Sequence, residues 1–359
     1  MKDVILQHLN MYPQMEIQDI IKLIYQSEFG GGHMISNSSE SLDRLYKECM
    51  RLSPVPPGTP IRYESIGHQL GRLYLNGIEN HLSLSTVNRF FVNTANQVHS
   101  DKSVFIQRLD KLVALCEQGE LPFDACMVRA YVEDYKKAGC PMTHHSPAYR
   151  KAYAPAYRVI SADFMRYIEV FERVDRLLRN ADGRPVLVAI DGRCGSGKSF
   201  LCRLLGEVYD CNQIHVDDFF LRPEQRTQER LTEVGGNVDY ERFQKEVLKP
   251  LLTRRQVFDY QRYDCMQQRL TKLVTVREKP LTIIEGSYSL HPYFGDIYDL
   301  KLFMDLDKET QKQRLLERNG EYMLGRFLSE WIPKEEAYFK THNIREKSDL
   351  VLSSELQNS

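Results

Sequence analysis

The chain has 359 residues, enough for two domains, and its 48 basic and 49 acidic side chains give a formal net charge of −1. This balance provides no global basic field, so we expect neither nucleic acid nor an anionic membrane as a partner. No apolar run is long enough to cross a bilayer, the amino terminus is a poor signal peptide, and the eight cysteines form no C-x-x-C pair, which together indicate a cytoplasmic protein with reduced thiols.

Residues 1–160 are predicted to form a mostly α-helical domain. Apolar side chains recur with helical spacing over residues 15–29, 38–52, 85–99, 101–118 and 122–138. Between the second and third of these helices we expect a short strand over 61–66 and a turn or short helix over 67–75. The segment 155–159 is interpreted as the arrival of the chain at a second domain, which then spans 161–359.

Four histidines of the first half lie beside glycines or beside each other, namely His33, His68, His144 and His145. One hypothesis is that their loops converge on a second small-molecule or metal site, since imidazole and carboxylate groups are common ligands. The alternative is that they are loop and cap residues that hold the helices together. Their spacing defines no set of metal ligands, so both interpretations stay open.

A helix is expected over 161–179, and 161–183 is a candidate connector to a phosphate loop. In the sequence RPVLVAIDGRCGSGKS at 184–199, a buried strand leads into the P-loop pattern G-x-x-x-x-G-K-[ST] and a helix start. Glycines let the backbone N–H groups point at phosphate oxygens, Lys198 can reach the β- and γ-phosphates, and the Ser199 hydroxyl can ligate Mg2+. The expected nucleotide-binding residues are Gly192, Arg193, Cys194, Gly195, Ser196, Gly197, Lys198, Ser199 and Phe200.

Strand and helix patterns alternate after the phosphate loop, which favours an α/β fold with a parallel sheet flanked by helices, as in P-loop NTPases. The expected strands are 211–216, 257–263, 281–284, 300–306 and 350–352, and the expected helices are 199–208, 239–252, 307–318 and 322–340, the last one broken or bent near Pro333.

Carboxylates follow two of these strands, where the ligand crevice of a parallel sheet lies. Asp217 or Asp218 suits a general base for phosphoryl transfer, and Glu285 suits the metal side, directly or through water. The alternatives are a turn or cap for the two aspartates and a salt bridge for Glu285. Arg314 and Arg318 share one helix face and could close over a triphosphate, or belong to a solvated basic face.

At this point the residues show a family likeness. The segment from about 185 to 352 resembles the uridine kinase and phosphoribulokinase group of P-loop kinases through the motifs DGRCGSGKS, HVDDFF, GNVDYERF, VFDYQRYDC, TIIEGSYSL and RLLERNGEYMLGRF. The resemblance implies a cytoplasmic kinase that uses ATP and Mg2+ to phosphorylate a primary hydroxyl. The VFDYQRYDC segment lacks the histidine of a pyrimidine site, so the acceptor is not identified.

The resemblance also implies roles for single residues. Asp217 is the catalytic base, Glu285 lies near magnesium together with Ser199, and Lys198 is catalytic. The acceptor is expected to contact Asp218, Asp239, Phe258, Tyr260 and Tyr263, and the lid arginines are Arg314 and Arg318, with Arg326 as a further candidate.

Three functions follow from these observations. The first is an ATP-dependent kinase for a nucleoside-like or other small hydroxyl metabolite. The second is a regulatory P-loop ATPase or switch that signals to the first half, and the third is a bifunctional enzyme with a second site in the first half. The expected partner is a small-molecule acceptor, and a homo-oligomer is compatible with the sequence.

Overall fold

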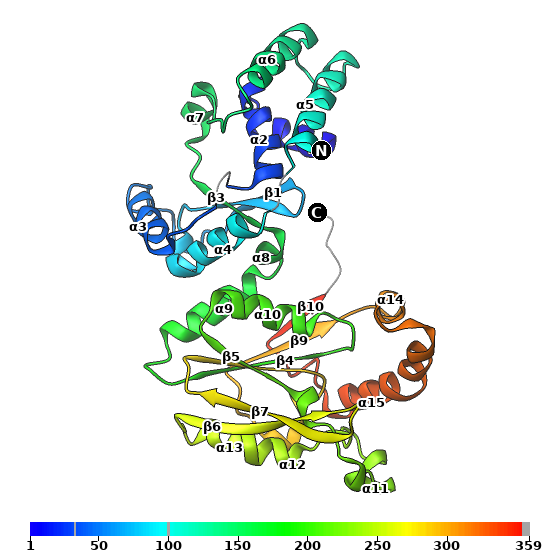
Figure 1. The fold of residues 1–359 in the computed structure, drawn as a ribbon. Coiled ribbons are helices and arrows are strands. Elements are labelled where there is room, and N and C mark those ends of the chain that lie inside the picture. The colour runs from blue at the N-terminus through cyan, green and yellow to red at the C-terminus, as the bar shows by residue number, and fades with distance from the viewer. Residues whose placement is uncertain (32–33, 99–100, 354–359) are drawn as a thin grey trace. The chain divides into compact units, whose positions relative to one another are not determined.

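The computed structural model describes residues 1–31, 34–98 and 101–353. The chain divides into two compact units, Met1–Asp175 and Arg176–Ser359 (Figure 1). The sequence analysis expected the boundary between the two domains after residue 160. The division lies within a helix, α9 (Ile168–Arg179), which belongs to the region expected to connect the two domains.

The first unit is mostly helical, as predicted. Its helices are α1 (Lys2–Met11), α2 (Ile17–Phe29), α3 (Ser38–Cys49), α4 (Leu84–Gln97), α5 (Lys102–Glu117), α6 (Ala125–Lys137), α7 (Pro147–Tyr153) and α8 (Ala162–Arg166). Five of them, α2 to α6, match the predicted segments, whereas α1 and α7 were not predicted. Tyr167 separates α8 from α9, so the single helix expected over 161–179 is two.

A three-stranded antiparallel sheet corrects two predictions for this unit. Its strands are β1 (Tyr63–Gly67), β2 (Leu70–Tyr74) and β3 (Tyr157–Ser161), in the order β1-β2-β3. The segment 67–75 is therefore mainly a strand, because His68 and Gln69 take positive φ angles and close a tight hairpin. The segment 155–159 does not lead out of the domain, since β3 pairs with β2 along its whole length.

The second unit is built on a five-stranded parallel sheet in the order β10-β9-β4-β8-β5. These strands are β4 (Val186–Gly192), β5 (Cys211–His215), β8 (Leu281–Glu285), β9 (Leu300–Asp305) and β10 (Leu350–Ser353). All residues of the interior strands β4 and β8 are buried, which explains why their sequences are mainly apolar. Helix α10 (Lys198–Val208) covers one face, and α12 (Tyr240–Phe243) and α13 (Lys249–Leu252) lie on the other (Figure 1).

Two further features of this unit differ from the predictions. The strand expected over 257–263 is the first arm of a hairpin, β6 (Val257–Asp264) with β7 (Arg269–Arg277), and it is not part of the parallel sheet. Helix α14 (Lys308–Arg326) is interrupted at Gly320, where φ is 75°, and a π-helical turn links it to α15 (Ile332–His342). Pro333 does not break the chain of helices, because it lies in the first turn of α15, where no N–H donor is needed.

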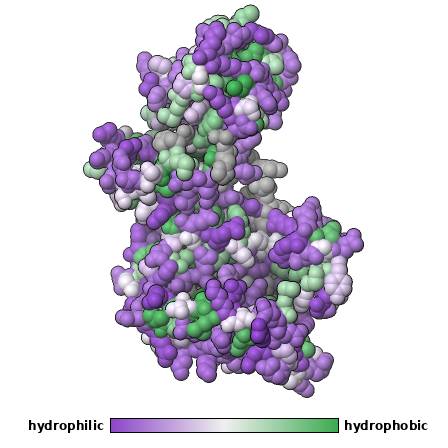
Figure 2. Space-filling view, viewed as in Figure 1, coloured by the Kyte–Doolittle hydropathy of each residue, from purple (hydrophilic) through white to green (hydrophobic). Residues whose placement is uncertain are grey.

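The face of the protein seen in Figure 2 is mainly hydrophilic, with small scattered apolar patches. Among the described residues, no helix combines the length and the apolar character that crossing a membrane requires.

Candidate active site

The phosphate loop joins the carboxyl end of β4 to the start of α10, as predicted. Gly192, Gly195 and Gly197 have φ angles of 134°, 77° and 96°, which other residues rarely adopt. A Cβ atom on Gly192 would lie 2.2 Å from the carbonyl oxygen of Met304 on β9, so the strand contact also requires glycine. The loop therefore has the backbone curl that its glycines predict.

Buried Asp191 anchors the start of this loop. Its carboxylate accepts hydrogen bonds from the backbone N–H groups of Gly192 at 2.7 Å and Leu290 at 3.0 Å, and from the Tyr338 hydroxyl at 2.9 Å. Burial raises its pKa to about 6 although these donors favour the charged form. Asp191 thus ties the loop to the segment after β8 and to α15, a positioning role that the sequence analysis did not assign.

Lys198 bends back over the loop. Its ammonium group donates to the carbonyl oxygens of Gly192 at 2.8 Å and Arg193 at 2.9 Å. Arg193 itself pairs with Asp305 and Glu336, and therefore its guanidinium group is committed to neighbouring strands and helices.

The other predicted nucleotide-binding residues also lie on or beside the loop. The Cys194 N–H donates to Glu335 at 3.0 Å, and burial raises the pKa of its thiol, so it stays protonated. The buried Ser196 hydroxyl has no hydrogen-bond partner among the described residues. Phe200 follows on α10 with the guanidinium group of Arg203 5.3 Å from its ring centre.

Ser199, Glu285 and His215 meet at the carboxyl ends of β8 and β5. The Ser199 hydroxyl donates to Glu285 Oε1 at 3.1 Å, and His215 Nδ1 lies 2.5 Å from the same oxygen. This hydrogen bond raises the pKa of His215 despite partial burial. The sequence analysis missed His215, although a polar residue ending a strand two positions before Asp217 was a usable signal.

These groups fit a magnesium ion. Mg2+ usually takes one or two protein oxygens and completes its octahedron with water and substrate phosphate. Ser199 and Glu285 converge on one point beside the phosphate loop and could supply those two oxygens. No group of three or more His, Cys, Asp or Glu side chains suited to a metal occurs in the part of the chain that the structure describes.

Asp217 and Asp218 follow β5 in a short 3-10 turn, Val216–Phe219, but differ in their surroundings. The Asp217 carboxyl is open to water on one side, yet the enclosing protein raises its pKa, and the negative charge of Glu285 adds to the effect while Lys198 opposes it. Asp218 is buried and accepts from Tyr260 at 3.1 Å and Arg262 at 2.8 Å. Asp217 is therefore the carboxylate that remains available for chemistry.

The residues expected around the acceptor are only partly brought together. Tyr260 contacts Asp218, and Tyr263 accepts a hydrogen bond from Arg226 at 3.0 Å. Asp239 is 2% exposed and caps α12 through the N–H of Arg242, so its side chain does not face open space.

Phe258 lies apart from the predicted site. It is a core residue that lines a small surface pocket with Pro185 and Thr282, at the amino ends of β4 and β8. The phosphate loop lies at the opposite, carboxyl ends of these strands.

The three predicted lid arginines also separate. Arg314 reaches the phosphate loop and donates to the Gly195 carbonyl oxygen at 3.3 Å. Arg318 donates to the Asn319 side chain at 2.8 Å, and Arg326 pairs with Glu330 beyond the break at Gly320. Of these three arginines, Arg314 is the one that contacts the nucleotide-binding segment in the part of the chain that the structure describes.

The histidines of the first unit do not converge on one site. His144 and His145 line one cleft, whereas His68 lines another with Ser27 and hydrogen-bonds Arg108 at 2.9 Å. His33 lies outside the described residues. The hypothesis of a shared metal site is therefore not supported by the histidines that the structure describes.

A parallel sheet in the order β10-β9-β4-β8-β5, with the phosphate loop between β4 and α10, defines the second unit as an α/β fold of the P-loop NTPase type. No family model matches the chain. Among solved structures, it is similar to a possible uridine kinase from Bacillus stearothermophilus, with 18% identity and a TM-score of 0.38 over 51% of this chain and 99% of that one. It is also similar to a D-glycerate 3-kinase from Cryptococcus neoformans, with 14% identity and a TM-score of 0.38 over 53% of this chain and 96% of that one.

These matches cover about half of this chain and nearly the whole of the two similar chains. At such identities they describe a likeness of fold, and the function must be argued from the site itself.

Proposed function

We propose that the second unit is an ATP-dependent kinase, which transfers the γ-phosphoryl group of ATP to a hydroxyl of a nucleoside-like or other small metabolite. The observation that carries this proposal is the grouping of an available carboxylate, Asp217, with Lys198 and the Ser199–Glu285 pair at one edge of the sheet. A loop that only binds phosphate does not need a carboxylate with a raised pKa beside it.

Each group has a chemical role in this proposal. Asp217 accepts the proton of the acceptor hydroxyl while the oxygen of that hydroxyl bonds to the γ-phosphorus and ADP leaves. Lys198 exchanges its backbone carbonyl partners for phosphate oxygens and offsets their charge. Ser199 and Glu285 would hold Mg2+, which neutralises phosphate charge when it is bound. Tyr260 and Arg262 hold Asp218 in place and so shape the wall next to Asp217.

The experiment is a screen of nucleosides, vitamins and sugar phosphates for acceptor-stimulated ADP release, with mass spectrometry to identify the phosphorylated product. With an accepted substrate, Asp217→Asn should lower kcat at least about 100-fold, as expected for loss of a general base, while ATP binding is kept. Asp210→Asn is the matched control, because Asp210 precedes the same strand and pairs with Lys279 at the exposed surface. Full-rate ATP hydrolysis without any acceptor, unchanged in Asp217→Asn, would favour a regulatory ATPase instead.

A further inference from the structure

The first unit contains a large polar cleft that the proposed kinase reaction does not use. Its volume is about 890 Å3, which lies in the range of small-molecule sites. Its walls come from α2, α3, α4, α7 and β3, so distant parts of the chain build it together.

The cleft carries an excess of positive charge. Four cationic side chains line it, and two of them have acidic partners there: Arg44 pairs with Glu40, and Arg158 pairs with Glu48 at 2.6 Å. The other two, Lys22 and Arg150, form no ion pair with an acidic side chain of the described residues. Lys22 donates to the carbonyl oxygen of Thr143 at 3.0 Å, and Arg150 is exposed on α7.

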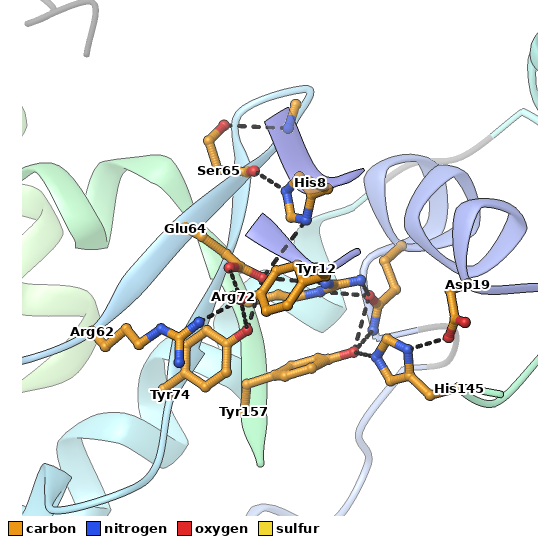
Figure 3. A network of polar contacts seen from close by, with 12 residues as sticks. His8, Tyr12, Asp19, Arg62, Glu64, Ser65, Arg72, Tyr74, His145 and Tyr157 are labelled. Atoms are coloured by element: carbon orange, nitrogen blue, oxygen red, sulfur yellow. Dashed lines mark hydrogen bonds and ion pairs between the residues drawn. The ribbon is translucent and has the colours of Figure 1, made fainter. Parts of the chain in front are cut away.

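One buried carboxylate beneath the floor of the cleft, Asp19, offsets part of this charge. Asp19 is fully buried, and its carboxylate accepts hydrogen bonds from His145 Nδ1 at 2.8 Å (Figure 3) and from the Ser146 N–H at 3.0 Å. The Tyr157 hydroxyl lies 2.6 Å from His145 Nε2, and both residues line the cleft. Burial raises the pKa of Asp19, but the hydrogen bonds from His145 and Ser146 outweigh this effect, so the pKa of Asp19 is lowered overall.

The protonation of this chain of groups follows from the same contacts. An ionised Asp19 can only accept, so His145 carries its proton on Nδ1, and burial lowers the pKa of the ring to about 4. The neutral ring then accepts the Tyr157 O–H through Nε2. The floor of the cleft therefore consists of the neutral side chains of Tyr157 and His145, which lie above the buried negative charge of Asp19.

A second charged pair behind the floor is also balanced. Arg72 is fully buried and bonds Glu64 at 3.2 Å and Gln26 Oε1 at 2.8 Å, with its guanidinium group 4.8 Å from the ring centre of Tyr157 (Figure 3). Glu64 also accepts from Tyr12 and Tyr74. This balance leaves the cleft cations, rather than the core, to decide which ligand is attracted.

We propose that this cleft is a second ligand site, which binds a small organic anion through Lys22 and Arg150. The anionic group is a phosphate or a carboxylate, because both match the donors of a guanidinium and an ammonium group. The remainder of the ligand lies against Phe91, whose ring stacks under the Arg158 guanidinium at 5.4 Å, and against the Tyr157 floor.

Burial and the nearby charge of Arg72 lower the pKa of Lys22 to about 8, although the charge of Asp19 opposes this effect, and an anionic ligand would favour the charged form of Lys22 further. The site is separate from the phosphate loop in the chain, and its test does not depend on the kinase reaction.

The test is isothermal titration calorimetry on the full chain at low salt, with glycerol 3-phosphate and citrate as anionic probes and glycerol as the neutral probe. At least one anion should bind, glycerol should not, and the two anions tell a phosphate site from a carboxylate site. Arg150→Ala should weaken binding by about tenfold or more, as expected for loss of a charge-assisted contact. Its matched control is Lys151→Ala, since Lys151 is the next residue on the same exposed helix and does not line the cleft.

Two further variants separate the outcomes. Lys198→Ala disables the phosphate loop, so anion binding that persists there belongs to the first unit, whereas binding that disappears would overturn the proposal. Lys22→Met should weaken binding as Arg150→Ala does. Absence of binding by both anions, or equal affinity in the wild type and Arg150→Ala, would also overturn it. Arg150 is exposed, so its loss is not expected to unfold the unit.

Discussion

Gly192→Ala is a precise test of how the phosphate loop is held. The added Cβ would lie 2.2 Å from the Met304 carbonyl oxygen and 2.6 Å from its nitrogen, and both are backbone atoms of β9 that cannot swing aside. The φ angle of 134° is strained for alanine as well. Strain of this kind costs about 1–3 kcal/mol, and overpacking costs a further amount of about 1–3 kcal/mol. We therefore expect the free energy of unfolding of the second unit to fall by about 2–6 kcal/mol.

The single tryptophan makes this measurable. Trp331 lies in the second unit, so its fluorescence in a urea titration follows that unit within the full chain. The midpoint should move to clearly lower urea in Gly192→Ala, and calorimetry should show weaker ATP binding, because the loop N–H groups shift with the strand. Gly325→Ala is the control, since no atom lies within 4 Å of its added Cβ in α14 and alanine favours a helix by about 0.5–1 kcal/mol. An unchanged midpoint and unchanged ATP affinity in Gly192→Ala would refute the reasoning.

Three other predictions concern charged and titratable side chains. Arg72→Met leaves Glu64 buried without its cation and should lower the free energy of unfolding of the first unit by about 3–5 kcal/mol, measured in a urea titration followed by circular dichroism. Adding Glu64→Gln should restore part of this stability. An equal loss of stability in Arg72→Met and in the double variant would argue against a stabilising Arg72–Glu64 pair. Because the pKa of Asp217 is raised above 3.8 and the base must be ionised, kcat/KM should fall as pH drops through that raised value, and a rate that does not fall would exclude Asp217 as the base. The pKa of His215 is raised above 6.5, so its pair with Glu285 stabilises the fold fully below about pH 6.5 and loses this effect as pH rises through the folded value; urea midpoints at about pH 6 and pH 9 should differ less in His215→Asn than in the wild type.

The phosphate loop was predictable from sequence because its requirements are local. Gly192, Lys198 and Ser199 follow a strand and open a helix within one short segment, so spacing alone places them. The roles of Asp217 and Glu285 needed one more inference, that both follow strands of one parallel sheet, and the structure brings them to the same edge.

The small sheet of the first unit was less predictable. Every residue of β2 is buried, so the strand has no alternation of polar and apolar positions, and it contains a charged residue, Arg72, that normally indicates the surface. Arg72 can be buried because two side chains accept hydrogen bonds from its guanidinium group. Glu64 lies across the hairpin on β1, and Gln26 lies far away in the sequence on α2. Such a partner set depends on tertiary structure and cannot be inferred from local pattern.

Phe258 shows a limit of residue-by-residue comparison. It was expected at the acceptor because a motif placed it there, and it does lie on the same face of β6 as Tyr260. A strand of eight residues, however, spans the depth of the domain, and Phe258 is at the end remote from the phosphate loop. The face of β6 on which Phe258 lies was predictable from the alternation of the sequence, whereas its distance from the phosphate loop along the strand was not.

The hydrogen bonds of Lys198 to its own loop have a consequence for selectivity. A ligand does not meet a free ammonium group; it must replace two neutral carbonyl oxygens that already bind it at 2.8 and 2.9 Å. An uncharged molecule of the same shape has no advantage over those oxygens, whereas each added negative charge strengthens the competitor. We therefore expect the loop to prefer ligands of higher negative charge, so that a triphosphate would gain more from the exchange than a mono- or diphosphate.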